Sequence, residues 1–218
     1  MDWLLTDDGW QLYLQGFWTT ARLTAASGVL ALVVGTLVAV ARVAPVPILR
    51  GVGIGYVTIF RNTPLLVLIL LTYYGLPEIG IDFGFFWNIT LALGLYTASF
   101  VAEALRSGLN GVPVGQAEAA RAIGMPFTGT MREVVLPQAF RLTVPPMASA
   151  FIALVKNTSL AAVFGVAEAT FRMRGFLNTY ASETFQVFLG FAVGYIVLVA
   201  VISAVATWFE RRWKVVYR

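Results

Sequence analysis

The sequence contains no cysteine and no histidine. These two absences exclude disulfides, thiolate nucleophiles, a histidine general base and zinc sites built on either side chain. Charged residues are also scarce, at 12% of 218 residues, whereas a soluble domain carries roughly 25%. Because so few charges cannot cover the surface of a soluble fold, the composition predicts an integral membrane protein.

The formal net charge of +4 does not indicate a nucleic-acid partner. The basic residues are scattered between hydrophobic blocks rather than gathered on one polar face. We therefore expect this chain to contact membrane lipid and to bind no nucleic acid.

Five hydrophobic stretches are long enough to cross a bilayer, because a spanning helix needs roughly 20 apolar residues. Two of them include a single cation, Arg61 in the second and Lys156 in the fourth. The first 16 residues carry acids and no base, unlike the start of a signal peptide. The sequence predicts an all-α integral membrane protein with one transmembrane domain, 1–218, and five spans at about 17–41, 52–77, 83–105, 141–167 and 184–209.

Lysine and arginine are distributed unequally between two sets of connections. Ten lie in 42–50, 103–141 and 210–218, whereas 1–16, 78–82 and 168–183 hold two. The ten are Arg42, Arg50, Arg106, Arg121, Arg132, Arg141, Arg211, Arg212, Lys214 and Arg218. Because basic residues are enriched on the cytoplasmic side of membrane proteins, we expect the N-terminus outside and the C-terminus in the cytoplasm.

The cytoplasmic loop 106–140 is long and polar. Pro113 suits the first turn of a helix and Gly124 suits its end, which predicts a helix of about three turns between them. A second short helix is expected over Phe127–Leu136, ending at Pro137. Because helices this short are marginal in water, they either fold back on their own bundle or enter a groove on a soluble partner.

The same loop resembles the EAA loop of ATP-binding-cassette (ABC) importer permeases. Glu118-Ala119-Ala120, Gly124 and Leu136-Pro137 stand at the spacing of that loop, with Val134 where the family usually has Ile. The resemblance implies that this helix docks on a separate ATPase. The coupling residues would be Gly115, Gln116, Glu118, Ala119, Ala120, Arg121 and Gly124.

Two further segments, Phe60–Leu65 and Lys156–Leu160, resemble the polar-amino-acid branch of these permeases. The resemblance covers about residues 15–212 and implies a type I ABC importer permease (MetI-like) fold in a bacterial plasma (inner) membrane. The implied partners are two ATP-binding subunits, a second permease (identical or homologous) and an extracytoplasmic amino-acid-binding protein.

The chain itself is not expected to be an enzyme or to hold a cofactor. It has no Gly-rich phosphate loop, and neither of its two lysines follows a glycine. ATP and Mg would therefore be bound by the partner ATPase, while this chain would form half of the translocation pathway.

Arg61, Asn62 and Thr63 precede Pro64 inside the second span. A charge at that depth costs roughly 2.5–3.5 kcal/mol and is by default a functional hypothesis. The helix after Pro64 is too short to cross alone, which predicts a break or re-entry here, with Thr63 as a cap and these residues on the substrate pathway. The alternative is that Arg61 snorkels to the inner headgroups. We expect Arg22, near the outer end of the first span, to be a snorkelling anchor on that side.

The run Lys156-Asn157-Thr158-Ser159 interrupts the fourth span near its middle. Snorkelling from mid-membrane is difficult, so we expect these four residues to face the bundle and line the substrate pathway. Their amide and hydroxyl groups can bind a zwitterion without a full charge. The alternative is an internal ion pair between Lys156 and an acid such as Glu103.

The intramembrane charges favour an acidic or amide substrate. Arg61 and Lys156 oppose one acid, Glu103, which we expect to pair locally with Arg106 at i,i+3. A net positive pathway suits glutamate or glutamine; the alternative is another polar amino acid such as arginine or histidine. A secondary transporter or channel is a more distant alternative. The outer connection 168–183 is expected to contribute to the surface that meets the binding protein.

Overall fold

The computed structural model describes Trp3 and residues 7–212, and every regular element in this part of the chain is helical. The expectation of an all-α protein is therefore confirmed. In chain order the elements are α2 (Asp7–Val43), α3 (Pro47–Asn62), α4 (Leu65–Leu70), η1 (Leu71–Gly75), α5 (Leu76–Glu78), α6 (Phe85–Asn110), α7 (Val114–Ala122), α8 (Phe127–Gly129), η2 (Thr130–Val135), α9 (Leu136–Asn157), η3 (Thr158–Phe164), α10 (Ala169–Thr179), η4 (Ala181–Glu183) and α11 (Thr184–Arg212). The segments η1 and η2 are π-helical, and η3 and η4 are 3₁₀-helical.

Four helical segments of the described chain are long and apolar enough to cross a membrane: 8–43, 85–110, 127–164 and 181–212. A fifth is obtained if α3 and the segment from α4 to α5 count as one span, although the two meet at 103°. The multi-pass helical architecture is therefore confirmed. The exact limits of the spans and the orientation of the termini stay predictions.

The bend between α3 and α4 lies where the sequence predicts a break. Thr63 has extended torsions (φ −93°, ψ 130°), which a residue before proline prefers, and Pro64 has no N–H to continue the helix. The expected N-cap role of Thr63 is wrong, because its hydroxyl donates back to the Ile59 carbonyl at 2.8 Å and Pro64 directly precedes α4.

The expected short helix ending at Pro137 is also wrong. Phe127–Phe164 is one continuous helical segment that passes from α8 through η2 into α9 and η3. Pro137 stands in the first turn of α9, directly after the π-helical η2, where its missing N–H is tolerated. Lys156 consequently lies at the end of α9 rather than near the middle of its span, and the backbone changes to 3₁₀ geometry at Thr158.

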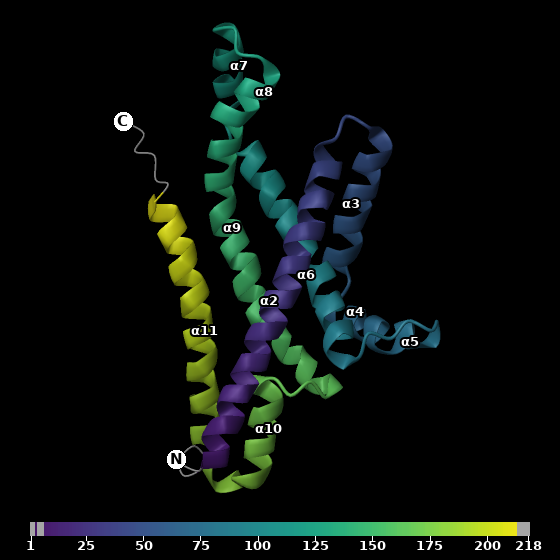
Figure 1. Cartoon of the computed structure of the whole chain (residues 1–218), viewed down its shortest axis with the longest axis vertical. Coiled ribbons are helices and arrows are strands. Elements are labelled where there is room, and N and C mark those ends of the chain that lie inside the picture. Colours follow the sequence, from purple (N-terminus) through teal and green to yellow (C-terminus); the bar gives the residue numbers. More distant parts are fainter. Residues whose placement is uncertain (1–2, 4–6, 213–218) are drawn as a thin grey trace.

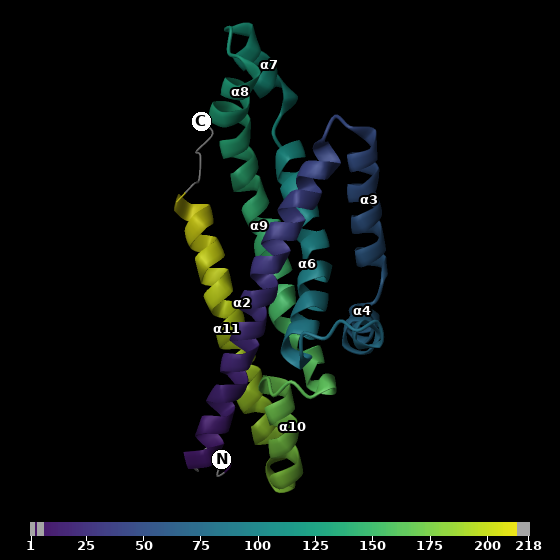
Figure 2. The ribbon, with the colours of Figure 1, turned by 45° about the vertical axis from the view of Figure 1, so that its right-hand side comes forward.

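Figures 1 and 2 show α2, α6, α9 and α11 running lengthwise through the molecule. The helix α7 lies at one end, with the α2–α3 connection on the same side, while α10 and the start of α2 lie at the opposite end. Two of the three connections that hold the ten basic residues counted above are thus on one side of the bundle. Lys214 and Arg218, which belong to the same count, lie outside the described residues.

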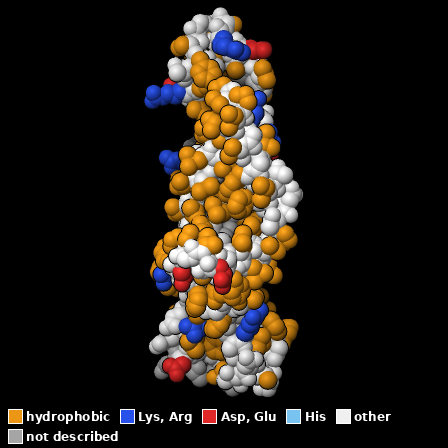
Figure 3. Space-filling model, turned by 90° about the vertical axis from the view of Figure 1, so that its right-hand side faces the viewer, with side chains coloured by type: hydrophobic (Ala, Val, Ile, Leu, Met, Phe, Trp, Pro, Cys, Tyr) orange, Lys and Arg blue, Asp and Glu red, His pale blue; other side chains and the backbone are white. Residues whose placement is uncertain are grey.

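The core lies between α2, α6 and α9, which pack side by side. Its central cluster includes the buried side chains of Leu23, Ile69, Ile89, Leu93 and Leu154. The outside is hydrophobic as well: Figure 3 shows apolar side chains across the middle of one face, with charged side chains gathered towards the two ends. Such a surface suits a hydrocarbon surrounding rather than water.

Candidate functional site

The projecting helix α7 carries six of the seven residues expected to couple this chain to an ATPase. The seventh, Gly124, lies two residues after the end of α7. The helix begins directly after Pro113 and spans Val114–Ala122, as the sequence predicts. Six of the seven expected residues are exposed and Ala120 is buried; the exposed ones are Gly115, Gln116, Glu118, Ala119, Arg121 and Gly124. The structure therefore presents this set on the surface of the molecule.

The end of α7 is locked by a Schellman motif. Gly124 has a φ of +85°, a conformation that side chains other than glycine rarely adopt. The N–H of Gly124 donates to the Arg121 carbonyl (2.9 Å), and the N–H of Met125 donates to the Ala120 carbonyl (3.1 Å). These two bonds satisfy carbonyls that the helix end leaves open. The position of Gly124, six residues after Glu118, thus has a structural reason, because Gly124 forms the turn that ends the helix.

One face of α7 packs on the chain and the other does not. Its inner side rests on a cluster formed by Val112, Val135 and Ala139, with Ala117 packed against it. At the tip, three large apolar side chains are exposed; Val114, Ile123 and Phe127 have relative exposures of 71%, 80% and 74%. Sequence reasoning considered alanines and charges and missed these side chains, although they flank the helix and its stop signal.

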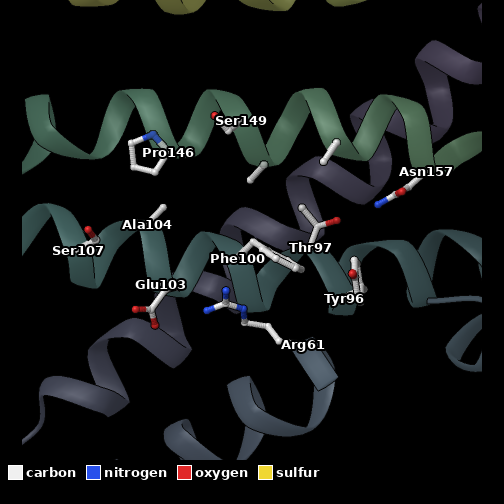
Figure 4. A pocket seen from close by; sticks show the side chains of 12 residues that line it. Arg61, Tyr96, Thr97, Phe100, Glu103, Ala104, Ser107, Pro146, Ser149 and Asn157 are labelled. Carbon is white, nitrogen blue, oxygen red and sulfur yellow. The ribbon is translucent and has the colours of Figure 1, made fainter. Parts of the chain in front are cut away.

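A second feature is a cavity of about 650 Å³ between α3, α6 and α9. It is lined by Arg61 from α3, by Tyr96, Thr97, Phe100, Glu103, Ala104 and Ser107 from α6, and by Pro146, Ser149, Ala150, Ala153 and Asn157 from α9. Figure 4 shows Asn157 directed from the end of α9 toward the space beside α6, and Arg61 reaching from α3 to α6. The cavity therefore joins one residue of each predicted substrate-pathway segment.

Arg61 and Asn157 are two of the polar groups of the cavity that remain available to a ligand. The Arg61 guanidinium lies over the Phe100 ring, 5.1 Å from its centroid, which holds the cation beside the cavity. Neither the guanidinium nor the Asn157 amide donates a hydrogen bond to another side chain or carbonyl within the described chain. A guanidinium that is not already satisfied can hold an amino-acid carboxylate, and a free amide can bond another polar group of the same ligand.

The other predicted pathway residues lie elsewhere. Asn62 donates to the Thr58 carbonyl (2.8 Å), and Thr158 is fully buried with its hydroxyl on the Val155 carbonyl (2.7 Å). Lys156 and Ser159 line a separate cleft of about 350 Å³ with residues of α10 and α11. Of the seven predicted pathway residues, Arg61 and Asn157 thus line the cavity, and Lys156 and Ser159 line the other cleft. The substrate role of each of the seven stays a prediction.

Glu103 is paired twice, once with the expected partner and once with an unexpected one. Arg106, three residues later on α6, forms the local ion pair that the sequence predicts. Arg42, from the last turn of α2, forms a second ion pair, with 2.5 Å between its Nη1 and Glu103 Oε2. The alternative pairing of Glu103 with Lys156 is therefore not the one that forms.

Sequence reasoning missed Glu168 altogether. This fully buried residue lies in the connection that joins the spanning segments 127–164 and 181–212, where its carboxyl group caps α10 by accepting a bond from the Phe171 N–H (2.8 Å). Its other oxygen accepts from the Tyr195 hydroxyl (2.9 Å) and lies 3.4 Å from the Thr20 hydroxyl. Burial raises the pKa of Glu168 above its usual value, while these hydrogen bonds act in the opposite direction. The Thr170 hydroxyl lies 2.8 Å from the Tyr195 hydroxyl. We call Glu168, Thr20, Thr170 and Tyr195 the Glu168 node.

Within the residues that the structure describes, no group of three or more His, Cys, Asp or Glu side chains is placed to hold a metal ion. The chemistry that the described groups support is recognition and positioning: a cation and an amide beside one cavity, and an exposed helix at one end of the bundle.

Comparison with known proteins gives a consistent result. Residues 31–215 match the family described as binding-protein-dependent transport system inner membrane component. The chain is 43% identical over 197 residues to the glutamate transport system permease protein GluC of Corynebacterium efficiens, covering 85% of this chain and 86% of that one. It is 34% identical over 212 residues to the probable glutamine ABC transporter permease protein GlnM of Bacillus subtilis, covering 96% and 97%. A crystal structure of an amino acid ABC transporter with histidines superposes with a TM-score of 0.87 at 30% identity, over 97% of this chain and 99% of that chain.

Proposed function

The chain belongs to the family of binding-protein-dependent transport system inner membrane components, and from that premise we propose that it forms half of the translocation pathway of an ATP-driven importer of glutamate or glutamine. It is a multi-pass membrane subunit of an ABC transporter. In this proposal the ATPase motor and the extracytoplasmic binding protein are separate subunits, and the family description, of an inner membrane component that depends on a binding protein, supports it.

The continuous helix Phe127–Phe164 is the observation that carries this proposal. Near its start, Val135 and Ala139 support the inner face of α7. Near its end, Ser149 and Asn157 line the cavity. A displacement of α7 by a bound ATPase would therefore be transmitted along one continuous helical segment to the proposed substrate cavity.

The partners follow from symmetry and from the two ends of the molecule. The cavity is bounded by α3, α6 and α9 of this chain alone, and we propose that a second permease, identical or homologous, completes the pathway. Two ATPases would then bind two α7 helices in the cytoplasm. The α10 end would face outward and meet the amino-acid-binding protein, in line with the distribution of Lys and Arg.

The substrate assignment has two supports. The relatives described above are named for glutamate and glutamine. Among the residues lining the cavity, Arg61 is the one cation, and Glu103, the one acid, is already paired with two arginines. A carboxylate or amide side chain is therefore favoured over a cationic one.

The decisive experiment concerns the exposed tip of α7. Ile123→Asp places a charge in the proposed contact, and we expect ATP-driven glutamate uptake by proteoliposomes containing the full complex to fall by about tenfold or more. Co-purification of the ATPase should fall with it. Ile48→Asp is the matched control, because Ile48 is equally exposed (77% against 80%) but lies on α3.

Two results would contradict the proposal. One is an Ile123→Asp complex that inserts normally and still couples ATP hydrolysis to uptake. The other is uptake by this chain alone in liposomes, without ATPase or binding protein, which would favour a secondary transporter or channel.

A further inference from the structure

The charge of the cavity is set partly by a residue that does not line it. Glu103 is the one acid among the residues lining the cavity, and a free carboxylate there would attract the side chain of a basic amino acid. Arg42 and Arg106 both bind this carboxylate. Arg106 is a local partner on α6, whereas Arg42 comes from another helix, 61 residues earlier in the chain.

Arg42 is held in place by the packing of α2 against α3. A Cβ atom on Gly53 would lie 2.7 Å from Arg42 Cγ and 3.2 Å from the Val38 carbonyl oxygen. Only glycine leaves room for the arginine stem to pass between the two helices and reach α6. The Arg42 side chain is largely shielded, at 15% exposure, so its charge is poorly screened by water.

We propose that Arg42 is a specificity-determining residue: Arg106 alone would balance the charge of Glu103, and the additional positive charge of Arg42 makes the cavity select anionic over cationic amino acids. This inference rests on the proposed function, because it takes the cavity as the substrate site. Arg42 and Arg106 then pair with this carboxylate, while Arg61 lines the same cavity. The sequence predicted two cations on the pathway, Arg61 and Lys156, but Lys156 does not line this cavity. Arg42 contributes the second positive charge instead, from behind Glu103.

The test measures binding of radiolabelled glutamate and arginine to the purified complex of permease and ATPase, without the binding protein. Arg42→Gln should lower the ratio of glutamate to arginine affinity by about tenfold, the size expected for one nearby charge at a partly screened site. Glu103→Gln, which leaves all three arginines intact, should raise the ratio by a similar factor.

The double variant Arg42→Gln/Glu103→Gln separates charge from structure. It restores the net charge of the wild type but not the contact between α2 and α6, so the ratio should return to within about threefold of the wild-type value. Arg22→Gln, on the same helix as Arg42 but outside the cavity, should leave the ratio unchanged.

Each other outcome has a definite meaning. An unchanged ratio in both single variants, or a double variant that remains as altered as Arg42→Gln, overturns the role of Arg42 while leaving the proposed function intact. A wild-type complex that binds neither amino acid overturns the substrate site and this inference together.

Discussion

The Glu168 node and the cavity beside Arg61 and Asn157 are both polar sites in a largely apolar molecule, but they are built in opposite ways. In the node, the buried carboxylate is held by Phe171, Tyr195 and Thr20, from three different elements. In the cavity, Arg61 and Asn157 face about 650 Å³ of open space without such partners. A polar group that is fully bonded ties helices together, whereas one left unbonded beside a cavity is available to a ligand.

The comparison predicts that Glu168→Ala has the largest effect on stability. The hydroxyl of Tyr195 and the N–H of Phe171 would lose their acceptor in a buried site, at a cost of roughly 2–4 kcal/mol. We expect a clearly lower thermal unfolding temperature of the detergent-solubilised complex. Glu78→Ala, at an exposed position in α5, should not change it. Equal unfolding temperatures for both variants would show that the node does not tie the helices together.

Arg61→Gln should affect transport without affecting stability. Losing the one cation that lines the cavity should reduce glutamate uptake by about tenfold, or 1.4 kcal/mol. Arg22→Gln is a matched control, because Arg22 also lies over a phenylalanine ring, 5.2 Å from the centroid of Phe86, but does not line the cavity. If the two variants transport equally well, Arg61 is a headgroup anchor, as the alternative sequence interpretation holds.

Asn157→Asp should have a smaller effect, seen in selectivity. A carboxylate at this position would attract a cationic side chain, so the ratio of arginine to glutamate uptake should rise by about threefold to tenfold. Asn62→Asp is the control, since its amide is bonded to the Thr58 carbonyl outside the cavity. Unchanged selectivity in the Asn157 variant would remove this residue from the substrate site.

The smallest effect concerns pH. Because burial raises the pKa of Glu168, the stability that its protonated form contributes is fully present below the unfolded value of about 4.3 and is lost as pH rises through the raised folded value. Glu168→Gln stays neutral, so the unfolding temperature of the wild type should fall relative to that of the variant between acidic and alkaline pH. A difference that does not change with pH would mean that the pKa of Glu168 is the same in the folded and the unfolded chain.

Much of the helical plan could be predicted from local sequence. Pro113 and Gly124 delimit α7 correctly, and Pro64 marks the break in the second span, because glycine and proline act on their own backbone. Pro137 misled the same reasoning. Pro137 does not end the helix, because it follows the π-helical turn η2, and no local signal in the sequence predicts that turn.

The candidate site was harder to predict. Lys156 and Asn157 are adjacent in sequence and were expected to act together, yet they line two different clefts. Successive residues of a helix point about 100° apart, so neighbours in sequence are seldom neighbours in a site. Glu168 and Arg42 were missed as partners because the groups they bind lie far away along the chain.

The sequence by itself determined that this chain is a helical membrane protein, where α7 begins and ends, and which polar residues lie within its hydrophobic segments. The length of a hydrophobic run and the positions of glycine and proline act on the local backbone, so these properties can be predicted without knowing which helices pack together. Only the tertiary structure decided which of those polar groups are satisfied and which face the cavity. That outcome depends on how distant helices pack against one another, and one close approach, of Gly53 to Arg42, is enough to place a charge behind the proposed substrate site.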